Sequence, residues 1–352
     1  MNDSAASVQQ KILLIRMINH GDVAAIGVPA LRFFKQTFPL ADIHFLSFGQ
    51  GKVIMELAEP HNTVKVLDAW PDDFFQAMEA FLGLAETIIA EAYQQIVNLD
   101  TAFMPCFLSR FLKDAGEPVS GNYLLISIEN LLNQVRDQSL QADYVNSSSA
   151  YLASSFFNMS RWHSQWWDTD YLPDGGYPEF YLKQCCGFSA LSLDKHIKLP
   201  KVSANKTAKY LKVVALCLSQ SDDGYLYPHS EALRLALQNK GISVKQDTGL
   251  QDSASALLQL LSESDLMVAK PGANKWLADA VACPTLLISG AAQPSIFMPD
   301  FATDPTRPCP VHSPIDEGTF AIKQACNCDD PQLLADNIAA ILLVSEEDPN
   351  HA

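Results

Sequence analysis

Residues 11–39, KILLIRMINHGDVAAIGVPALRFFKQTFP, limit the fold of this chain more than any other stretch. Residues 12–17 are apolar except for Arg16, which is the pattern of a short buried strand. The Asn-His-Gly-Asp turn at residues 19–22 ends this run, and apolar side chains then recur at helical spacing over residues 23–38. A strand that turns directly into a helix predicts an open α/β sheet, and such sheets bind ligands at this turn.

Asp22 is the leading candidate for a catalytic residue. At the start of a helix, its carboxylate is expected to serve as an N-cap, as a catalytic base, or as both. Asn19 and His20 can supply hydrogen bonds to a ligand, and His20 is either a solvated loop histidine or a proton shuttle. Gly21 allows an unusual backbone conformation beside the ligand.

The composition indicates a cytoplasmic protein with ample material for buried cores. Apolar residues make up 48% of the chain and charged residues 18%. The 24 Lys and Arg against 40 Asp and Glu give a net charge of −16, which disfavours nucleic acid as a partner. The first ten residues lack the basic start of a signal peptide, and no apolar run approaches the roughly 20 residues that span a bilayer. The scattered cysteines are expected to be reduced and mostly buried.

The rest of the chain alternates between strand and helix patterns. In the first half, the predicted strands are 11–17, 42–48, 63–67 and 95–100, and the predicted helices are 23–38, 53–59 and 71–93. In the second half, the predicted strands are 210–219, 242–246, 266–269 and 285–289, and the predicted helices are 228–239, 254–264, 274–282 and 331–343. This alternation predicts two doubly wound α/β domains with parallel sheets, joined by a linker near residues 199–209.

An aromatic-rich segment, residues 147–181, interrupts the alternation. It holds Trp162, Trp166 and Trp167 close together, followed by several tyrosines. These side chains are interpreted either as the packing of an irregular insertion or as an aromatic lining for a sugar.

A second candidate site is the Lys-Pro-Gly-Ala-Asn-Lys turn at residues 270–275, between a predicted strand and a predicted helix. A glycine turn at a helix N-terminus presents unpaired N–H groups, which can bind a diphosphate. The alternative is an ordinary Pro-Gly turn. Ser219 follows the first strand of the second domain, where a ligand would also meet the sheet, and Ser221 and Asp222 lie just beyond it.

Several motifs are absent from these strand-to-helix turns. The P-loop, the GxGxxG fingerprint, the Gly-x-Ser-x-Gly elbow and an Asp-x-Asp pair do not occur at these turns. Cys309, His312, Cys326 and Cys328 do not have a standard zinc spacing, and these thiols are interpreted as structural rather than metal-binding. We therefore expect neither a metal nor a cofactor.

The amino-terminal half resembles the ADP-heptose:lipopolysaccharide heptosyltransferases, glycosyltransferase family nine. Residues 11–48 match the strand, Gly-Asp turn and Pro-Ala-Leu helix with which that family begins. VKVLDAW at residues 64–70 and the segment 94–116 match its following elements, and residues 328–342 match its last helix. The match is specific over about the first 120 residues and looser beyond them.

This resemblance implies a GT-B fold, in which two Rossmann-like doubly wound domains face each other across a cleft. Residues 1–198, with the aromatic insertion, would bind the acceptor, and residues 199–352 would bind the nucleotide sugar. The implied enzyme is an inverting, metal-independent glycosyltransferase that moves a heptose-like sugar to a lipopolysaccharide core or another envelope glycan. Contact with the inner membrane would be peripheral and made through the acceptor.

The resemblance also implies roles for individual residues. Asp22 would be the general base, with the acceptor bound by its three neighbours Asn19, His20 and Gly21. The donor diphosphate would be bound by a larger set: Ser219, Lys270, Gly272, Ala273, Asn274 and Lys275.

The donor segment departs from the family pattern. An Asp-Thr-Gly turn with a histidine one helical turn later is usual in the family, whereas this chain has Pro-Gly-Ala at residues 271–273 and Trp276 at the histidine position. The family lysine after the first strand of the second domain is replaced by Asp222 and Asp223. Two alternatives therefore stay open: a non-catalytic sugar- or partner-binding relative with a degenerate donor site, and a heptosyltransferase that glycosylates protein.

Overall fold

The protein folds as two compact units, Met1–Lys195 and His196–Ala352, each with its own sheet. The computed structural model describes residues 10–17, 19–59, 64–68, 78–169, 172–199, 212–218, 227–246, 253–289, 296–304 and 328–347. The two α/β sheets confirm the predicted fold class.

The first unit contains a six-stranded sheet in the order β3-β2-β1-β4-β5-β6. Its strands are β1 (Lys11–Ile15), β2 (Asp42–Ser47), β3 (Lys65–Asp68), β4 (Gln95–Asn98), β5 (Val119–Leu124) and β6 (Leu152–Ser154). Neighbouring strands are parallel from β3 to β5, whereas β6 pairs with β5 in the antiparallel direction. The sequence pattern did not predict β5 or β6.

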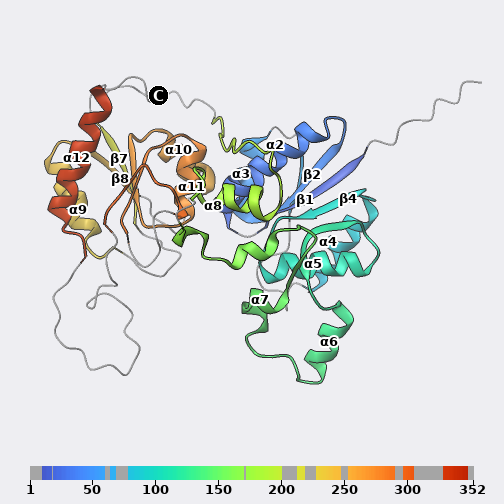
Figure 1. Ribbon diagram of the computed structural model, residues 1–352. Coiled ribbons are helices and arrows are strands. Elements are labelled where there is room, and N and C mark those ends of the chain that lie inside the picture. The colour runs from blue at the N-terminus through green and yellow to red at the C-terminus, as the bar shows by residue number, and fades with distance from the viewer. Residues whose placement is uncertain are drawn as a thin grey trace, which may run out of the picture. The chain divides into compact units, whose positions relative to one another are not determined.

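The main helices of this unit cover both faces of the sheet. They are α2 (Val28–Thr37), α3 (Gly49–Ala58), α4 (Met78–Ala90), α5 (Phe103–Asp114) and α6 (Ile128–Arg136). Helices α2 and α3 lie on one face, and α4 and α5 lie on the other (Figure 1). The aromatic segment forms only short helical turns: η2 (Tyr144–Asn146), α7 (Ser148–Tyr151), η3 (Met159–His163), η4 (Trp166–Asp168), α8 (Gly176–Glu179) and η5 (Phe180–Cys185).

The helix after β1 contains a π-helical turn. It begins with α1 (His20–Asp22), continues through η1 (Val23–Gly27) and passes into α2. The N–H of Val28 bonds to the carbonyl of Val23, five residues earlier. Pro29 follows at once, and its ring and missing N–H disfavour regular α-helical bonding at this point. The helix thus begins three residues earlier than the sequence pattern predicted, and a π turn follows Asp22 directly, a feature common at functional sites.

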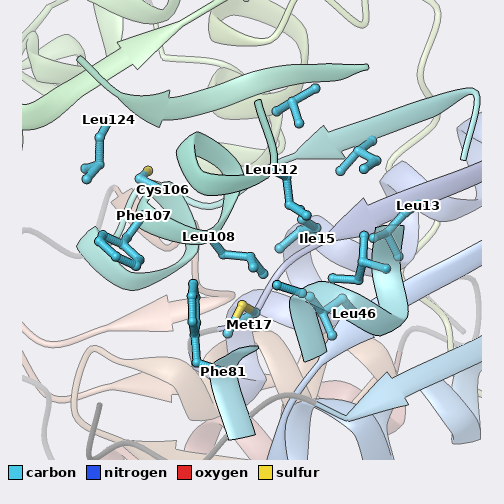
Figure 2. Packing of buried hydrophobic residues seen from close by; sticks show 14 of the residues in the cluster. Leu13, Ile15, Met17, Leu46, Phe81, Cys106, Phe107, Leu108, Leu112 and Leu124 are labelled. Atoms are coloured by element: carbon cyan, nitrogen blue, oxygen red, sulfur yellow. The ribbon is translucent and has the colours of Figure 1, made fainter. Parts of the chain in front are cut away.

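A core of the first unit lies between the sheet and helices α4 and α5. Figure 2 shows Leu13, Ile15 and Met17 from β1 and its extension packing toward Phe81 of α4 and Leu108 of α5. All five side chains are less than 5% exposed. This core fixes the carboxyl end of β1 against its neighbours, so residues that follow the strand are held in defined positions.

The second unit contains a five-stranded parallel sheet in the order β11-β10-β9-β7-β8. Its strands are β7 (Val213–Cys217), β8 (Ser243–Gln246), β9 (Leu266–Ala269), β10 (Thr285–Leu287) and β11 (Phe301–Ala302). Its helices are α9 (Ser230–Asn239), α10 (Ala254–Ser262), α11 (Ala273–Ala280) and α12 (Pro331–Glu347). Helices α9 and α12 pack side by side over one core of this sheet (Figure 1).

Gly121 is expected to be the least replaceable glycine of the first sheet. Its φ is +82°, and an added Cβ would lie 2.2 Å from the carbonyl oxygen of Asn98 in β4. Left-handed strain and the backbone clash together predict that Gly121→Ala lowers the free energy of unfolding by about 2–4 kcal/mol. Gly116→Ala is the matched control, because Gly116 has a φ of +94° but no atom within 4 Å of the added Cβ. Urea titration of both variants tests this, and equal losses would contradict it.

Candidate active site

The candidate site lies where the strand order of the first sheet reverses. Strand β1 has β2 on one side and β4 on the other, and the chain leaves these neighbours in opposite directions along the sheet. Arg16 follows β1, and Asp100 follows β4 at the same edge. Ligands of open α/β sheets bind at this position, outside the carboxyl ends of the strands.

Asn19, not Asp22, caps the helix that starts here. The side chain of Asn19 accepts a hydrogen bond of 3.0 Å from the N–H of Gly21. Asn19 also has the unusual backbone, with a φ of 64°, which asparagine tolerates better than most residues. The interpretations of Asp22 as the N-cap and of Gly21 as the site of unusual backbone were therefore wrong. His20 and Gly21 lie in the first turn of the helix, His20 half-buried and Gly21 buried.

Asp22 instead forms an ion pair with Arg16. Nη2 of Arg16 lies 2.5 Å from Oδ2 of Asp22. The Arg16 side chain is only 3% exposed and the Asp22 side chain is 25% exposed. A buried guanidinium requires such partners, because an unpaired charge in the interior is strongly unfavourable.

Asp100 completes the network around Arg16. Its Oδ1 lies 3.7 Å from Nη1 of Arg16, and the same Nη1 donates a 2.8 Å hydrogen bond to the carbonyl of Leu99. The Asp100 carboxylate also accepts hydrogen bonds from the N–H groups of Met17, at 2.8 Å, and Thr101, at 3.0 Å. Asp100 thereby joins the ends of β1 and β4.

The electrostatics of this cluster keep Arg16 charged. Burial alone would lower the pKa of the Arg16 guanidinium, but the carboxylates of Asp100 and Asp22 outweigh burial and raise its pKa. A guanidinium at hydrogen-bond distance favours the ionised form of a carboxylate. Asp22 is thus presented as an oriented carboxylate that is partly open to solvent, a group that can accept a proton from a bound hydroxyl.

The aromatic segment reaches the same site through Tyr181. This fully buried side chain donates a 2.7 Å hydrogen bond to the carbonyl of Leu99, and its ring lies 5.8 Å from Cζ of Arg16. Trp166 is also buried and stacks on Phe180 with ring centroids 4.7 Å apart. Packing therefore accounts for this part of the segment, in line with the first of its two interpretations.

Arg16, Asp100 and Tyr181 are site residues that the sequence reasoning did not identify. The signal for Arg16 was present, since it is the one charged residue within the apolar run 12–17. A charge in a buried strand requires a nearby opposite charge, and Asp100 at the end of another predicted strand was available. Tyr181 had no comparable signal.

The predicted donor residues of the second unit are grouped around the start of α11. Gly272 is its N-cap, with extended backbone, and Ala273 and Asn274 form its partly buried first turn. Lys270 follows β9, is 6% exposed, and donates a 3.4 Å hydrogen bond from Nζ to the carbonyl of Ser289. Burial raises the pKa of Asp329, and the nearby charge of Lys270 acts in the opposite direction.

Lys275 and Ser219 differ from the other predicted donor residues. Lys275 is 3% exposed, and its Nζ forms an ion pair with Asp279 one turn later. Its amine is therefore engaged within the helix. Ser219 lies outside the described residues, as do Ser221 and Asp222. Trp276, at the position of the family histidine, is 3% exposed and stacks on Phe297.

Within the described ranges, no three His, Cys, Asp or Glu side chains come together as a metal site would require. Of the cysteine group considered from the sequence, only Cys328 is described. The described helices include none with the length and apolar character needed to cross a bilayer.

Comparison with known proteins gives a likeness of fold. No family model and no curated protein sequence matches the chain. The structure of E. coli ADP-heptose lipopolysaccharide heptosyltransferase II matches with a TM-score of 0.57 at 13% identity, over 96% of this chain and 100% of that one. A glycosyl transferase of family 9 from Veillonella parvula matches with a TM-score of 0.65 at 12% identity, over 95% and 97% of the two chains. E. coli heptosyltransferase WaaC, solved with ADP, has a TM-score of 0.51 at 12% identity, over 85% and 93%.

The chain therefore has the GT-B fold of these glycosyltransferases. The structural likeness to the heptosyltransferases, which the sequence resemblance predicted, covers both units.

Proposed function

We propose that this chain is a glycosyltransferase that moves a heptose-like sugar from a nucleotide-diphosphate donor to a lipopolysaccharide core or another envelope glycan. The observation that carries the proposal is the Arg16–Asp22 pair at the switch point of the first sheet, in a chain with the GT-B fold. The protein would act in the cytoplasm and meet the inner membrane only through its acceptor.

In the proposed reaction, Asp22 is the general base. The acceptor hydroxyl oxygen attacks the anomeric carbon of the donor sugar while its proton passes to the Asp22 carboxylate. The bond from that carbon to the diphosphate breaks, so the anomeric configuration inverts. Arg16 pairs with the Asp22 carboxylate and fixes its orientation before the attack. Asn19, His20 and Gly21 are proposed to contact the acceptor from the same turn.

The leaving diphosphate is proposed to bind at the start of α11. The N–H groups of Ala273 and Asn274 lie at the positive end of the helix dipole, where they can stabilise developing negative charge. Lys270 adds a positive charge at the end of β9, and Gly272 allows close approach of the backbone. Ser219 and Lys275 stay in the proposal as further donor contacts, although Lys275 would have to leave Asp279. No metal takes part in this scheme.

A panel of nucleotides tests the donor site. A diphosphate present at 100 times its Kd stabilises the folded state by about 2.7 kcal/mol, which raises the melting temperature by roughly 5–10 °C. We expect such a shift with ADP or another nucleoside diphosphate and none with adenosine. Lys270→Met should reduce the shift, whereas Lys240→Met should not, since Lys240 pairs with Asp336 on α12. A wild-type protein that responds to no nucleotide or nucleotide sugar would contradict the proposal.

The non-catalytic alternative has one observation in its favour. Lys270 and Lys275 are both buried and held by groups of their own unit, as expected of a donor site that has lost its ligand. This alternative predicts that no nucleotide raises the melting temperature and that the protein binds a glycan alone. A protein-glycosylating enzyme differs only in its acceptor, and mass spectrometry of a co-expressed acceptor protein tests it.

A further inference from the structure

A continuous series of contacts joins Asp22 to the aromatic segment. Asp22 pairs with Arg16, whose Cζ lies 5.8 Å from the Tyr181 ring. The Tyr181 ring lies 5.8 Å from the ring of Tyr177, at an angle of 33°. The indole N–H of Trp162 donates a 3.2 Å hydrogen bond to the Tyr177 hydroxyl. Tyr181 is sealed in the core, but Tyr177 and Trp162 are both partly exposed.

The Tyr177 hydroxyl is set up as a hydrogen-bond donor. Its oxygen accepts from Trp162, so its own proton must point elsewhere. The part of the chain that the structure describes supplies no acceptor for that proton. Burial raises the pKa of Tyr177, and the nearby charge of Asp22 raises it further, so the phenol keeps its proton at physiological pH. A donor that is linked to the candidate base through Tyr181 and Arg16, and oriented by a tryptophan, is suited to a sugar oxygen.

We propose that Tyr177 and Trp162 form a pyranose-binding subsite beside Asp22, in which the Tyr177 hydroxyl donates a hydrogen bond to an oxygen of the sugar that carries the attacking hydroxyl. The negative face of an aromatic ring attracts the C–H face of a pyranose, so the partly exposed Trp162 ring is the stacking surface. Trp162 also acts as a positioning residue through its hydrogen bond to Tyr177. This inference rests on the proposed function, because it assigns the acceptor of that reaction.

The test is sugar binding by the full chain. Methyl α-D-glucopyranoside, methyl α-D-galactopyranoside and methyl α-D-mannopyranoside serve as probes in saturation-transfer NMR, with saturation expected at the ring C–H protons of at least one of them. Tyr177→Phe removes one neutral hydrogen bond and should raise the Kd of that probe about 3–10-fold. Trp162→Phe, which removes the indole donor, should raise it by about 2–3-fold. In the transfer reaction, Tyr177→Phe should raise the acceptor KM by a similar factor and leave kcat and the donor KM within about twofold.

Matched controls come from the same unit. Tyr123→Phe alters a partly exposed tyrosine beneath Lys113, and Trp167→Phe alters a tryptophan that packs edge-on against Trp166. Both should bind the probe as the wild type does. The subsite is wrong if the wild type binds none of the three probes, or if Tyr177→Phe binds like Tyr123→Phe.

Failure of the subsite can be distinguished from failure of the proposed function, because binding of the probe requires neither a donor nor sugar transfer. A wild type that binds the probe through Tyr177 but transfers no sugar contradicts the transferase alone. A chain that transfers sugar, but whose Tyr177→Phe variant has an unchanged acceptor KM, contradicts the subsite alone.

Discussion

Replacing Asp22 with asparagine is expected to lower kcat for sugar transfer by about 10²–10⁴-fold, the usual contribution of a general base. Asparagine has nearly the same shape, and its side-chain carbonyl can still accept a hydrogen bond from Arg16, but it cannot take the proton of the acceptor hydroxyl. The donor-induced rise in melting temperature should persist, since the donor residues belong to the other unit. The measurement is steady-state transfer with the donor found by the nucleotide panel.

The matched control is Asp194→Asn. Asp194 also pairs with an arginine, Arg32, at 3.0 Å, but its side chain is 56% exposed and takes no part in the proposed site. Its kcat should stay within about twofold of the wild type, because exposed ion pairs contribute little. The pH profile gives a second readout: the acidic limb of kcat/KM that reports the base should vanish in Asp22→Asn. Retention of more than about a tenth of kcat in Asp22→Asn would assign the base to another residue.

The first turn of the site shows which features can be predicted from the local sequence pattern and which cannot. The strand-turn-helix order was predictable because the apolar period changes at residue 19. The pattern did not indicate which polar residue caps the helix, since both Asn19 and Asp22 are good caps. The choice is made by Arg16, which engages the Asp22 carboxylate and leaves the capping position to Asn19.

The rest of the site depends on contacts between distant residues. Arg16 meets Asp100 only because β1 and β4 are neighbours in the sheet, and Tyr181 meets the carbonyl of Leu99 across a separation of 82 residues. Short 3₁₀ and π turns carry no strong apolar period, so the aromatic segment could not be placed from its sequence. The sequence showed the length and aromatic character of this segment, but it did not show that Tyr177 would lie near Asp22.

In the second unit, the strand-turn-helix around Gly272 was predictable for the same reason as the first. The partners of its lysines were harder to foresee. Asp279 lies one helical turn after Lys275, a spacing that favours an ion pair, whereas the carbonyl of Ser289 reaches Lys270 only through the pairing of β9 with β10. The availability of a lysine for a ligand therefore depends on tertiary structure more than on its place in a motif.

Replacing Arg16 with methionine is expected to lower the free energy of unfolding of the first unit by about 3–5 kcal/mol, the usual effect of removing one partner from a buried ion pair. The Asp100 carboxylate would stay buried without its cation, and Asp22 would repel it. For a unit of this size, the loss corresponds to a fall in melting temperature of roughly 6–20 °C. Arg16→Lys keeps the charge but not the forked geometry, so it should lose less than Arg16→Met.

Arg136→Met is the control for that loss, because Arg136 is 73% exposed and pairs with Asp137 on the surface. It should change the free energy of unfolding by less than about 1 kcal/mol. In the double variant Arg16→Met/Asp22→Asn, the loss in free energy of unfolding is expected to be smaller than the sum of the two single losses by about 0.5–3 kcal/mol. The reason is that Asp22→Asn removes the carboxylate that Arg16 had balanced. Urea unfolding of the four proteins of this cycle measures that coupling. Additive losses, or an Arg16→Met protein as stable as Arg136→Met, would mean that the pair does not organise the carboxyl ends of β1 and β4, and Asp22 would lose its orienting partner.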